Sequence, residues 1–205
     1  MNGARIVVSL GTDVHPFERL LAWAEAFADH HPEVSVLVQH GSSRAPIGRA
    51  RGVVATDRDT LLSWYRAADV VITQGGPGSI LDAREAGKIP LVVPRDPALG
   101  EHVDGHQQAF VPVMVGAGHA VLVSELGQLS PLVNERLAEP RRFATAERHA
   151  DASGPAAALG ELVDAALGAP AARGQLRRRV RDLLRPRPRP EPTIPATSPS
   201  HQGTR

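Results

Sequence analysis

The sequence predicts an α/β fold in which a parallel sheet carries helices on both faces. Short apolar runs alternate with segments of helical periodicity over most of the chain. The runs VVSL, VVIT and LVV are continuously apolar, which is typical of strands buried on both sides. Turn residues separate these runs from the helical segments. The chain is therefore expected to form consecutive right-handed βαβ units.

The strands are predicted from short runs rich in Val, Ile and Leu that end at turn residues. The last of them, HAVLV, precedes two weaker helical patterns. In chain order the six expected strands cover residues 5–10, 34–39, 52–55, 69–73, 89–94 and 119–123.

The helices are predicted from apolar residues at helical spacing. We expect Asp57 to cap the second helix and Gly87 to close the third, and we expect Pro112 to kink or shorten the fourth. The expected helices cover residues 16–30, 57–67, 79–86 and 106–116, followed by the weaker patterns at 126–138 and 154–167.

Composition excludes several classes of chemistry. The 205 residues include no cysteine, which excludes a disulfide framework, a thiolate metal site and a cysteine nucleophile. No apolar run approaches the ~20 residues of a membrane-spanning helix, and the N-terminal stretch is too short for a signal peptide. We therefore expect a cytoplasmic protein, which would be held at a membrane only through another component.

Charge divides the chain into a domain over residues 1–170 and a tail over 171–205. The tail carries nine Arg and two acidic residues, a net charge of +7, whereas the remainder carries 14 basic and 20 acidic residues, a net charge of −6. Its repeated prolines predict a disordered, extended segment. Without aromatic residues or a recognition motif, the tail favours no nucleic-acid partner, although it can attract anionic lipid headgroups.

Three polar loops should lie beyond the carboxyl ends of the strands, where open parallel sheets bind ligands. They cover residues 11–15, 74–79 and 95–107. The second, Gln74-Gly-Gly-Pro-Gly-Ser79, joins a strand to a helix, so its backbone N–H groups can bind an anion with help from the helix dipole. A tight turn that needs glycine is the structural alternative. The segment matches neither a P-loop nor the GxGxxG fingerprint.

The segment Glu101-His-Val-Asp-Gly-His-Gln107 gathers two acids, two histidines and a glutamine in seven residues. Carboxylates and amides hydrogen-bond the hydroxyl groups of ribose and sugars, which is the favoured interpretation. A metal site formed by His102, Asp104 and His106 is the less favoured alternative, because residues two apart share a face only on a strand. In the first loop, His15 can titrate near neutral pH, or it is simply an exposed polar residue.

Three longer segments occur in a fixed order within residues 5–125: SLGTDVHPFERL, TQGGPGSILDAREAGKIPLVVPR and GEHVDGHQQAF. Together they resemble the C-terminal, donor-binding domain of family 28 glycosyltransferases. The small stand-alone type of bacterial polysaccharide synthesis is most similar. The catalytic subunit of the eukaryotic two-subunit transferase that adds the second N-acetylglucosamine to dolichol also resembles the chain.

The resemblance implies a Rossmann-like domain that forms the C-terminal half of a GT-B fold, in which a nucleotide-sugar binds between two domains without a metal or other cofactor. It also implies roles for individual residues. Glu101 would hold ribose or sugar hydroxyls, His106 and Gln107 would read the donor sugar, and Thr12 would line the cleft. The diphosphate would lie against Gln74, Gly75, Gly76, Gly78 and Ser79.

Two positions depart from the family pattern. Gln74 stands where the family commonly has His, so this position can donate a hydrogen bond but carries no charge. Asp13 follows Gly-Thr where His is usual, and His15 comes two residues later. His15 is therefore the local candidate for a catalytic base.

The expected function is that of a donor-binding catalytic subunit of a two-subunit glycosyltransferase. It would transfer a sugar from a UDP-sugar, of the N-acetylglucosamine or glucuronate type, to a polyprenyl-diphosphate-linked saccharide in exopolysaccharide or cell-surface glycan synthesis. A membrane-associated, acceptor-binding subunit would hold the chain at the inner face of the membrane. The alternative is a nucleotide-sugar-binding or regulatory module without turnover, which Gln74 favours.

Overall fold

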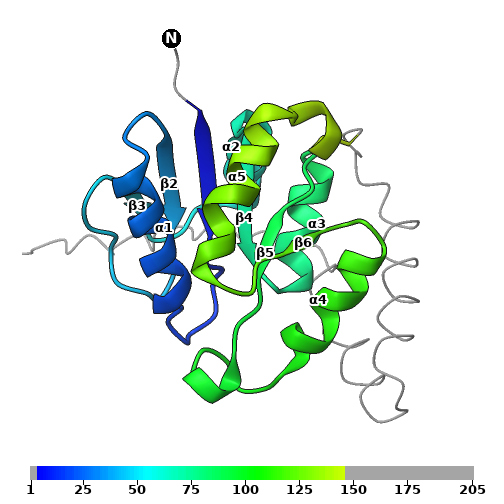
Figure 1. The fold of residues 1–205 in the computed structure, drawn as a ribbon. Helices are drawn as coiled ribbons and strands as arrows, with labels where there is room; N and C mark the ends of the chain where they lie inside the picture. Colours follow the sequence, from blue (N-terminus) through cyan, green and yellow to red (C-terminus); the bar gives the residue numbers. More distant parts are fainter. Residues whose placement is uncertain (1–3, 146–205) are drawn as a thin grey trace, which may run out of the picture. The chain divides into compact units, whose positions relative to one another are not determined.

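The computed structural model describes residues 4–145, which form a six-stranded parallel sheet with helices on both faces (Figure 1). The strands are β1 (Arg5–Ser9), β2 (Ser35–Gln39), β3 (Arg51–Val53), β4 (Val70–Gln74), β5 (Leu91–Val93) and β6 (Val121–Leu122). Their order in the sheet is β3-β2-β1-β4-β5-β6, and every pair is parallel. The predicted fold class is therefore confirmed.

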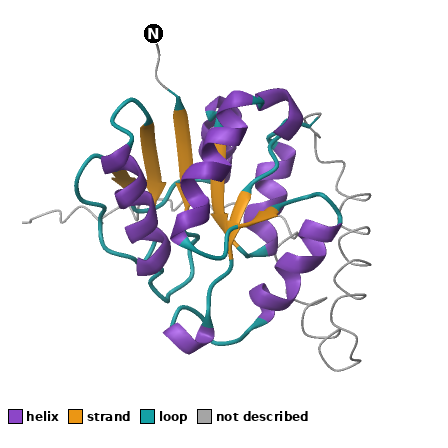
Figure 2. Ribbon diagram, in the orientation of Figure 1, coloured by secondary structure: helices purple, strands orange, loops and turns teal. Residues whose placement is uncertain are grey.

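Five α-helices connect or cover the strands of the described residues (Figure 2). They are α1 (Glu18–His30), α2 (Arg58–Ala67), α3 (Pro77–Glu85), α4 (His106–Gly116) and α5 (Leu129–Ala138). Three short 3₁₀ turns accompany them: η1 (Pro97–Leu99), η2 (Leu126–Gln128) and η3 (Pro140–Phe143). The predicted helix at 154–167 and the predicted tail at 171–205 lie outside the described residues.

Three details differ from the sequence prediction. Helix α1 begins at Glu18 rather than at residue 16, with Phe17 as its N-cap. Helix α3 begins at Pro77, two residues earlier than predicted, because proline fits the first helical turn, where no N–H bond is needed. Pro112 does not shorten α4, which covers the whole predicted range; the ring lies on the exposed side, where water can satisfy the carbonyl of the missing bond.

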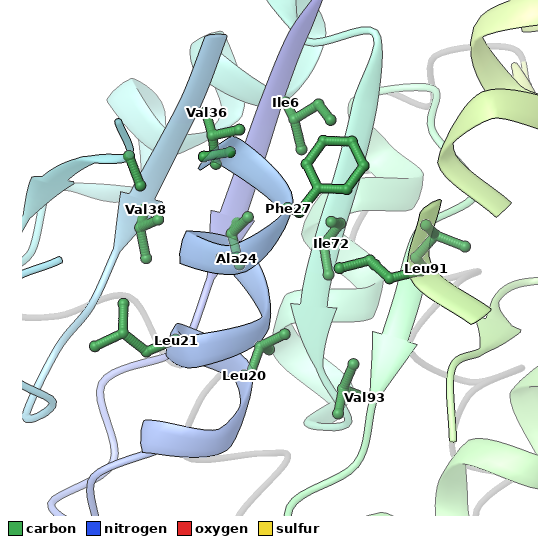
Figure 3. Packing of buried hydrophobic residues seen from close by; sticks show 14 of the residues in the cluster. Ile6, Leu20, Leu21, Ala24, Phe27, Val36, Val38, Ile72, Leu91 and Val93 are labelled. Atoms are coloured by element: carbon green, nitrogen blue, oxygen red, sulfur yellow. The ribbon is translucent and has the colours of Figure 1, made fainter. Parts of the chain in front are cut away.

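Two apolar layers cover the sheet. On one face, helices α1 and α5 pack against alternate residues of the central strands (Figure 3), among them Ile6, Val8, Ile72, Leu91 and Val93. On the other face, Val7 and Val71 pack against residues of α2 and α3 and of their C-caps, namely Leu62, Tyr65, Ala68, Ala83 and Ala86. The central strands are thus buried on both sides, as their continuous apolar runs predict.

The sheet order places a topological switch point between β1 and β4. From β1 the chain adds β2 and β3 on one side, then returns to add β4, β5 and β6 on the other. In open α/β sheets, ligands bind beyond the carboxyl ends of the strands at this point. None of the helices within residues 4–145 combines the length and apolarity needed to cross a bilayer.

Candidate functional site

The three predicted loops meet at the carboxyl edge of the sheet. They follow β1, β4 and β5, which are neighbours in the sheet and parallel. The first two loops approach closely, because a Cβ atom added to Gly11 would lie 3.2 Å from Nε2 of Gln74. The second loop also adjoins the start of α4, since a Cβ atom on Gly75 would lie 3.1 Å from Cβ of Gln107. One compact site results.

The turn after β4 uses its three glycines differently. At Gly75, an added Cβ atom would come within 2.7 Å of Cγ2 of Val111, so glycine is needed for α4 to pack closely. Gly76 is the N-cap residue of α3. Gly78 is exposed, and no atom of the described residues lies within 4 Å of the position its Cβ atom would take. Gly75 therefore lets α4 pack closely against the turn, whereas Gly78 leaves the outer side of the turn open.

The side chain of Gln74 caps the beginning of α3. Its Oε1 accepts the N–H of Gly76, and its Nε2 donates to Oγ of Ser79 at 2.9 Å. Gly78 and Ser79 occupy the second and third helical positions, whose N–H groups have no carbonyl partner within a helix. These two N–H groups, at the positive end of the helix dipole, form the part of the turn best suited to an anion.

The buried side-chain amide of Gln39 holds the turn after β1 in place. Gly11 has a φ of +84°, a left-handed conformation that favours glycine. Nε2 of Gln39 donates to the carbonyl of Gly11 at 3.0 Å, and Oε1 of Gln39 accepts the hydroxyl of Ser9 at 2.7 Å. Thr12 follows as an exposed residue at the top of the turn.

Asp13 and His15 form a carboxylate–imidazole pair in the same loop. Oδ1 of Asp13 lies 2.6 Å from Nδ1 of His15 and accepts the backbone N–H of His15 at 2.8 Å. Burial opposes ionisation of Asp13, but these hydrogen bonds and the positive charges of Arg95 and His102 outweigh it and hold the pKa of Asp13 below its usual range. The carboxylate thus orients the imidazole, with Nδ1 toward the acid and Nε2 left to accept a proton.

The pair continues into the loop before α4. Nε2 of His102 lies 3.5 Å from Oδ2 of Asp13, and Nδ1 of His102 lies 3.2 Å from Oδ1 of Asp104. Asp104 in turn contacts Nδ1 of His106 at 2.7 Å. Carboxylates and imidazoles therefore alternate along a chain of five side chains. Within residues 4–145, no three of these residue types are arranged to hold a metal ion, so the alternative of a metal site gains no support.

Glu101 is buried and forms an ion pair with Arg19. Its carboxylate accepts two bonds from Arg19 of α1, from Nε at 2.9 Å and from Nη2 at 2.7 Å, and also the N–H of Asp96 at 2.8 Å. The Glu101 residue is only 5% exposed. In the structure, Glu101 joins α1 to the loop after β5.

Arg95 is the central residue that sequence reasoning missed. It is 2% exposed, and it donates to the carbonyls of Leu10 at 2.8 Å and of His15 and Glu101 at 2.7 Å each. Its backbone N–H donates to Oε1 of Gln107 at 3.1 Å. Burial lowers the pKa of Arg95, opposed by the charges of Asp13 and Glu101. The only sequence signal is an Arg directly after the apolar run IPLVVP.

The structure thus brings the predicted residues to one edge but at different depths. Thr12, Gly78 and His106 are exposed, whereas Gly75, Glu101 and Gln107 are buried. The supporting residues Gln39, Arg19 and Arg95 were not predicted, because their partners lie far away in the sequence. Gln39 could have been suspected as a polar residue that ends an apolar strand.

Fold and site together define a Rossmann-like α/β domain with a glycine-rich helix N-terminus at its switch point. Residues 17–161, more than half of the chain, match the glycosyltransferase family 28 C-terminal domain. The chain belongs to this family, which confirms the resemblance seen in the three motifs. No curated protein sequence shows a significant match to the chain.

Several solved structures are similar at low sequence identity. The glycotransferase of kitacinnamycin is 20% identical, with a TM-score of 0.49 over 85% of this chain and 43% of that chain. The glycosyltransferase SnogD from Streptomyces nogalater is 19% identical, with a TM-score of 0.45 over 87% and 44%. The solution structure of ALG13 is 16% identical, with a TM-score of 0.44 over 72% and 91%. This chain therefore spans less than half the length of the first two proteins.

The packing role of Gly75 is testable against Gly78 in the same turn. We expect Gly75→Ala to lower the free energy of unfolding by about 1–3 kcal/mol, because the new methyl group would overlap Val111 and Gln107. Gly78→Ala should be neutral or stabilising by up to about 1 kcal/mol, since its methyl group meets nothing and alanine favours the helix. Urea unfolding followed by circular dichroism measures both; equal effects would contradict the assignment.

The role of Arg95 can be measured in the same way. We expect Arg95→Met to lower the free energy of unfolding by about 3 kcal/mol, because three carbonyls, two of them in buried contacts, lose their donor. The matched control is Arg142→Met, which removes an exposed arginine paired with Glu135 and should cost less than about 1 kcal/mol. A loss at Arg95 no larger than that at Arg142 would show that the loops are held by something else.

Proposed function

We propose that the chain is the donor-binding catalytic subunit of a two-subunit glycosyltransferase. The donor would be a UDP-sugar of the N-acetylglucosamine or glucuronate type, and the acceptor a polyprenyl-diphosphate-linked saccharide in exopolysaccharide or cell-surface glycan synthesis. The observation that carries the proposal is the glycine-rich N-terminus of α3, which lies at the switch point of a family 28 domain.

In this proposal the diphosphate of the donor lies against Gly78 and Ser79. Their N–H groups have no partner within the helix, and Gly78 leaves the space above the turn open. The same groups would stabilise the negative charge that grows on the leaving diphosphate as the sugar bond breaks. Because the helix supplies this stabilisation, the proposed reaction requires no metal ion, and we expect activity to be unchanged in EDTA.

The Asp13–His15 pair supports His15 as the catalytic base. Its Nδ1 is engaged by Asp13 at 2.6 Å, which leaves Nε2 to take the proton of an acceptor hydroxyl. The hydroxyl oxygen would bond to the anomeric carbon as the bond from that carbon to the diphosphate breaks, and UDP would leave. His15 is half-buried, so the imidazole can be reached from the surface of the site.

The remaining residues would orient the donor. His106 and Thr12 are exposed at the rim and would contact the sugar and line the cleft, respectively. Gln107 is buried, and its Oε1 accepts the N–H of Arg95, so its amide nitrogen is the group left for a sugar hydroxyl. For Glu101, whose oxygens already accept three N–H groups, contact with ribose hydroxyls would be an additional role beside its ion pair.

Gln74 is the observation that favours the alternative of a binding or regulatory module without turnover. Its Oε1 already accepts the N–H of Gly76, and it supplies no positive charge toward a phosphate. A donor that needs this N–H would have to displace the amide. Binding of UDP without transfer to any acceptor, even with a partner subunit present, would favour this second function.

A partner subunit is part of the proposal, because no acceptor site is assigned to this chain. Val14, Leu99 and Val103 are large apolar side chains exposed on the loops around the site. Exposed apolar side chains near one site favour a protein contact. We propose that a membrane-associated, acceptor-binding subunit covers them and holds the chain at the inner face of the membrane.

Diphosphate binding is testable with two variants of equal size. We expect Gly78→Asp to weaken UDP binding at least tenfold relative to Gly78→Asn, because only the former adds a negative charge beside the diphosphate. Neither variant should unfold the chain, since the site of the new side chain is open and a carboxylate near a helix N-terminus is favourable. Isothermal titration calorimetry with UDP gives both affinities. Equal affinities would show that the diphosphate does not bind beside Gly78.

Dependence on a partner is tested by activity. We expect the purified chain alone to transfer no sugar to a polyprenyl-diphosphate-linked acceptor, and the co-expressed pair to do so. His15→Gln should then lower turnover at least a hundredfold while leaving UDP affinity within about twofold, because a base acts in the transfer step rather than in donor binding. Robust turnover by the chain alone would overturn the two-subunit proposal.

A further inference from the structure

A pocket lies at the opposite edge of the sheet from the candidate functional site. It has a volume of about 200 Å³ and is lined by residues at the amino ends of β4 and β5, by α5 and by η3. Figure 1 shows these elements together, away from the loops that follow β1 and β5. Its apolar lining includes Val70, Ile89, Pro140 and Phe143, and its basic lining comprises Lys88, Arg136 and Arg141.

The segment after α5 closes one side of this pocket. The N–H of Ile89 donates to the carbonyl of Phe143 at 3.1 Å, and the N–H of Thr145 donates to the carbonyl of Gly87 at 2.9 Å. Lys88 and Ala144 form an antiparallel bridge between them. This side of the pocket is thus held by main-chain hydrogen bonds.

Arg136 is a buried cation at this pocket with an incomplete set of partners. It is 2% exposed, yet within residues 4–145 its Nε and Nη2 atoms have no hydrogen-bond partner, and Nη1 makes a long bond of 3.4 Å to the carbonyl of Leu132. The ring of Phe143 stacks on the guanidinium with its centroid 4.4 Å away. Burial lowers the pKa of Arg136 to about 10, opposed by the charge of Glu135. An unpaired buried charge of this kind is costly.

The two unpaired nitrogens, Nε and Nη2, form the side-on edge of the guanidinium, which can donate two parallel N–H bonds to a carboxylate or phosphate. At two other arginines the same edge is occupied: Nε and Nη2 of Arg19 hold both oxygens of Glu101, and Nε and Nη2 of Arg58 hold Asp82 and Glu85. Within residues 4–145, Arg95 and Arg136 are the buried arginines. Arg95 also has an unpaired Nε, but its other two nitrogens make three short bonds to carbonyls, whereas both nitrogens of the side-on edge of Arg136 are unpaired.

We propose that this pocket binds a small anion, a carboxylate or phosphate monoester that carries an apolar group, with the side-on edge of Arg136 as its anchor. The apolar group would lie against Ile89, Pro140 and Phe143, and the anionic group would receive two N–H bonds. Three basic side chains line the pocket against one acid, Asp69, whose carboxylate already accepts the N–H of Arg5 at 2.7 Å. The net charge of the lining therefore favours an anion.

Ligand entry requires a local shift. The unpaired nitrogens are covered in the structure, so an anion reaches them only if the Arg136 side chain rotates or η3 moves. Binding should therefore change the surroundings of Phe143, the last residue of η3, and of Ala144 after it, as well as those of Lys88 and Ile89. This pattern distinguishes the pocket from the turn at α3, which also attracts anions but lies at the other edge of the sheet.

The experiment is a titration of the full chain with inorganic phosphate, benzoate and phenyl phosphate, followed by amide chemical shifts. We expect saturable shifts at Lys88, Ile89, Phe143 and Ala144, with phenyl phosphate or benzoate binding at least tenfold more tightly than inorganic phosphate. The same shifts should persist in Gly78→Asp, the variant designed to disable the proposed donor site. The test of the anion pocket therefore does not depend on the donor proposal, and failure of the anion proposal would leave the donor proposal unaffected.

Substitution at Arg136 separates binding from folding. Arg136→Met should unfold at the same or a higher temperature than the wild type without anion, because it removes an unpaired buried charge. It should lose at least tenfold in affinity and show no rise in melting temperature with phenyl phosphate. The control Arg141→Gln, at an exposed lining residue, should change affinity less than threefold. Three results would each overturn the proposal: absence of saturable shifts with all three anions, equal shifts in Arg136→Met, or a lower melting temperature of Arg136→Met without anion.

Discussion

The buried guanidinium of Arg95 is the interaction on which the candidate functional site depends. A charge buried without partners is strongly unfavourable, and the partners of Arg95 are carbonyls of the loops after β1 and β5. These loops are 85 residues apart in the sequence at the Leu10 contact. Because the guanidinium is satisfied only when both loops are docked, the position of each loop is coupled to folding of the sheet.

Other contacts around Arg95 extend the same principle. The ion pair between Arg19 and Glu101 ties α1 to the loop after β5, and Gln107 ties the start of α4 to the backbone of Arg95. Gly75 lets α4 approach the turn before α3. These buried contacts together support the exposed groups of the site, such as the N-terminal turn of α3. A site supported in this way needs little reorganisation when a ligand binds.

Sequence patterns predict the fold well because its central strands β1, β4 and β5 are largely buried. Continuous apolar runs such as VVIT are typical of such strands, whereas the edge strands β3 and β6 are short and more exposed. Local patterns also located the three loops. They misjudged the start of α3, since Pro77 was assigned to the turn rather than to the first helical position.

Sequence patterns could not predict how the site is supported. Arg19 and Glu101 are 82 residues apart, and no local periodicity links an acid in a loop to a base on a helix. Contact of Glu101 with ribose or sugar hydroxyls stays a prediction, but the sequence could not show that its oxygens also accept N–H groups of the chain itself. The same limit applies to Arg95 and Gln39, whose polar groups are satisfied only by tertiary contacts.

The two buried arginines at opposite edges of the sheet show how such contacts separate support from binding. Arg95 and Arg136 are equally buried, and burial lowers the pKa of both. Arg95 leaves only its Nε unpaired, because Nη1 and Nη2 make three short bonds to carbonyls and hold the loops together. Arg136 stacks on Phe143 and leaves its side-on edge unpaired beside a pocket. An anion paired with this edge would offset the cost of burying the charge, which is why the proposed ligand is placed at Arg136 rather than at Arg95.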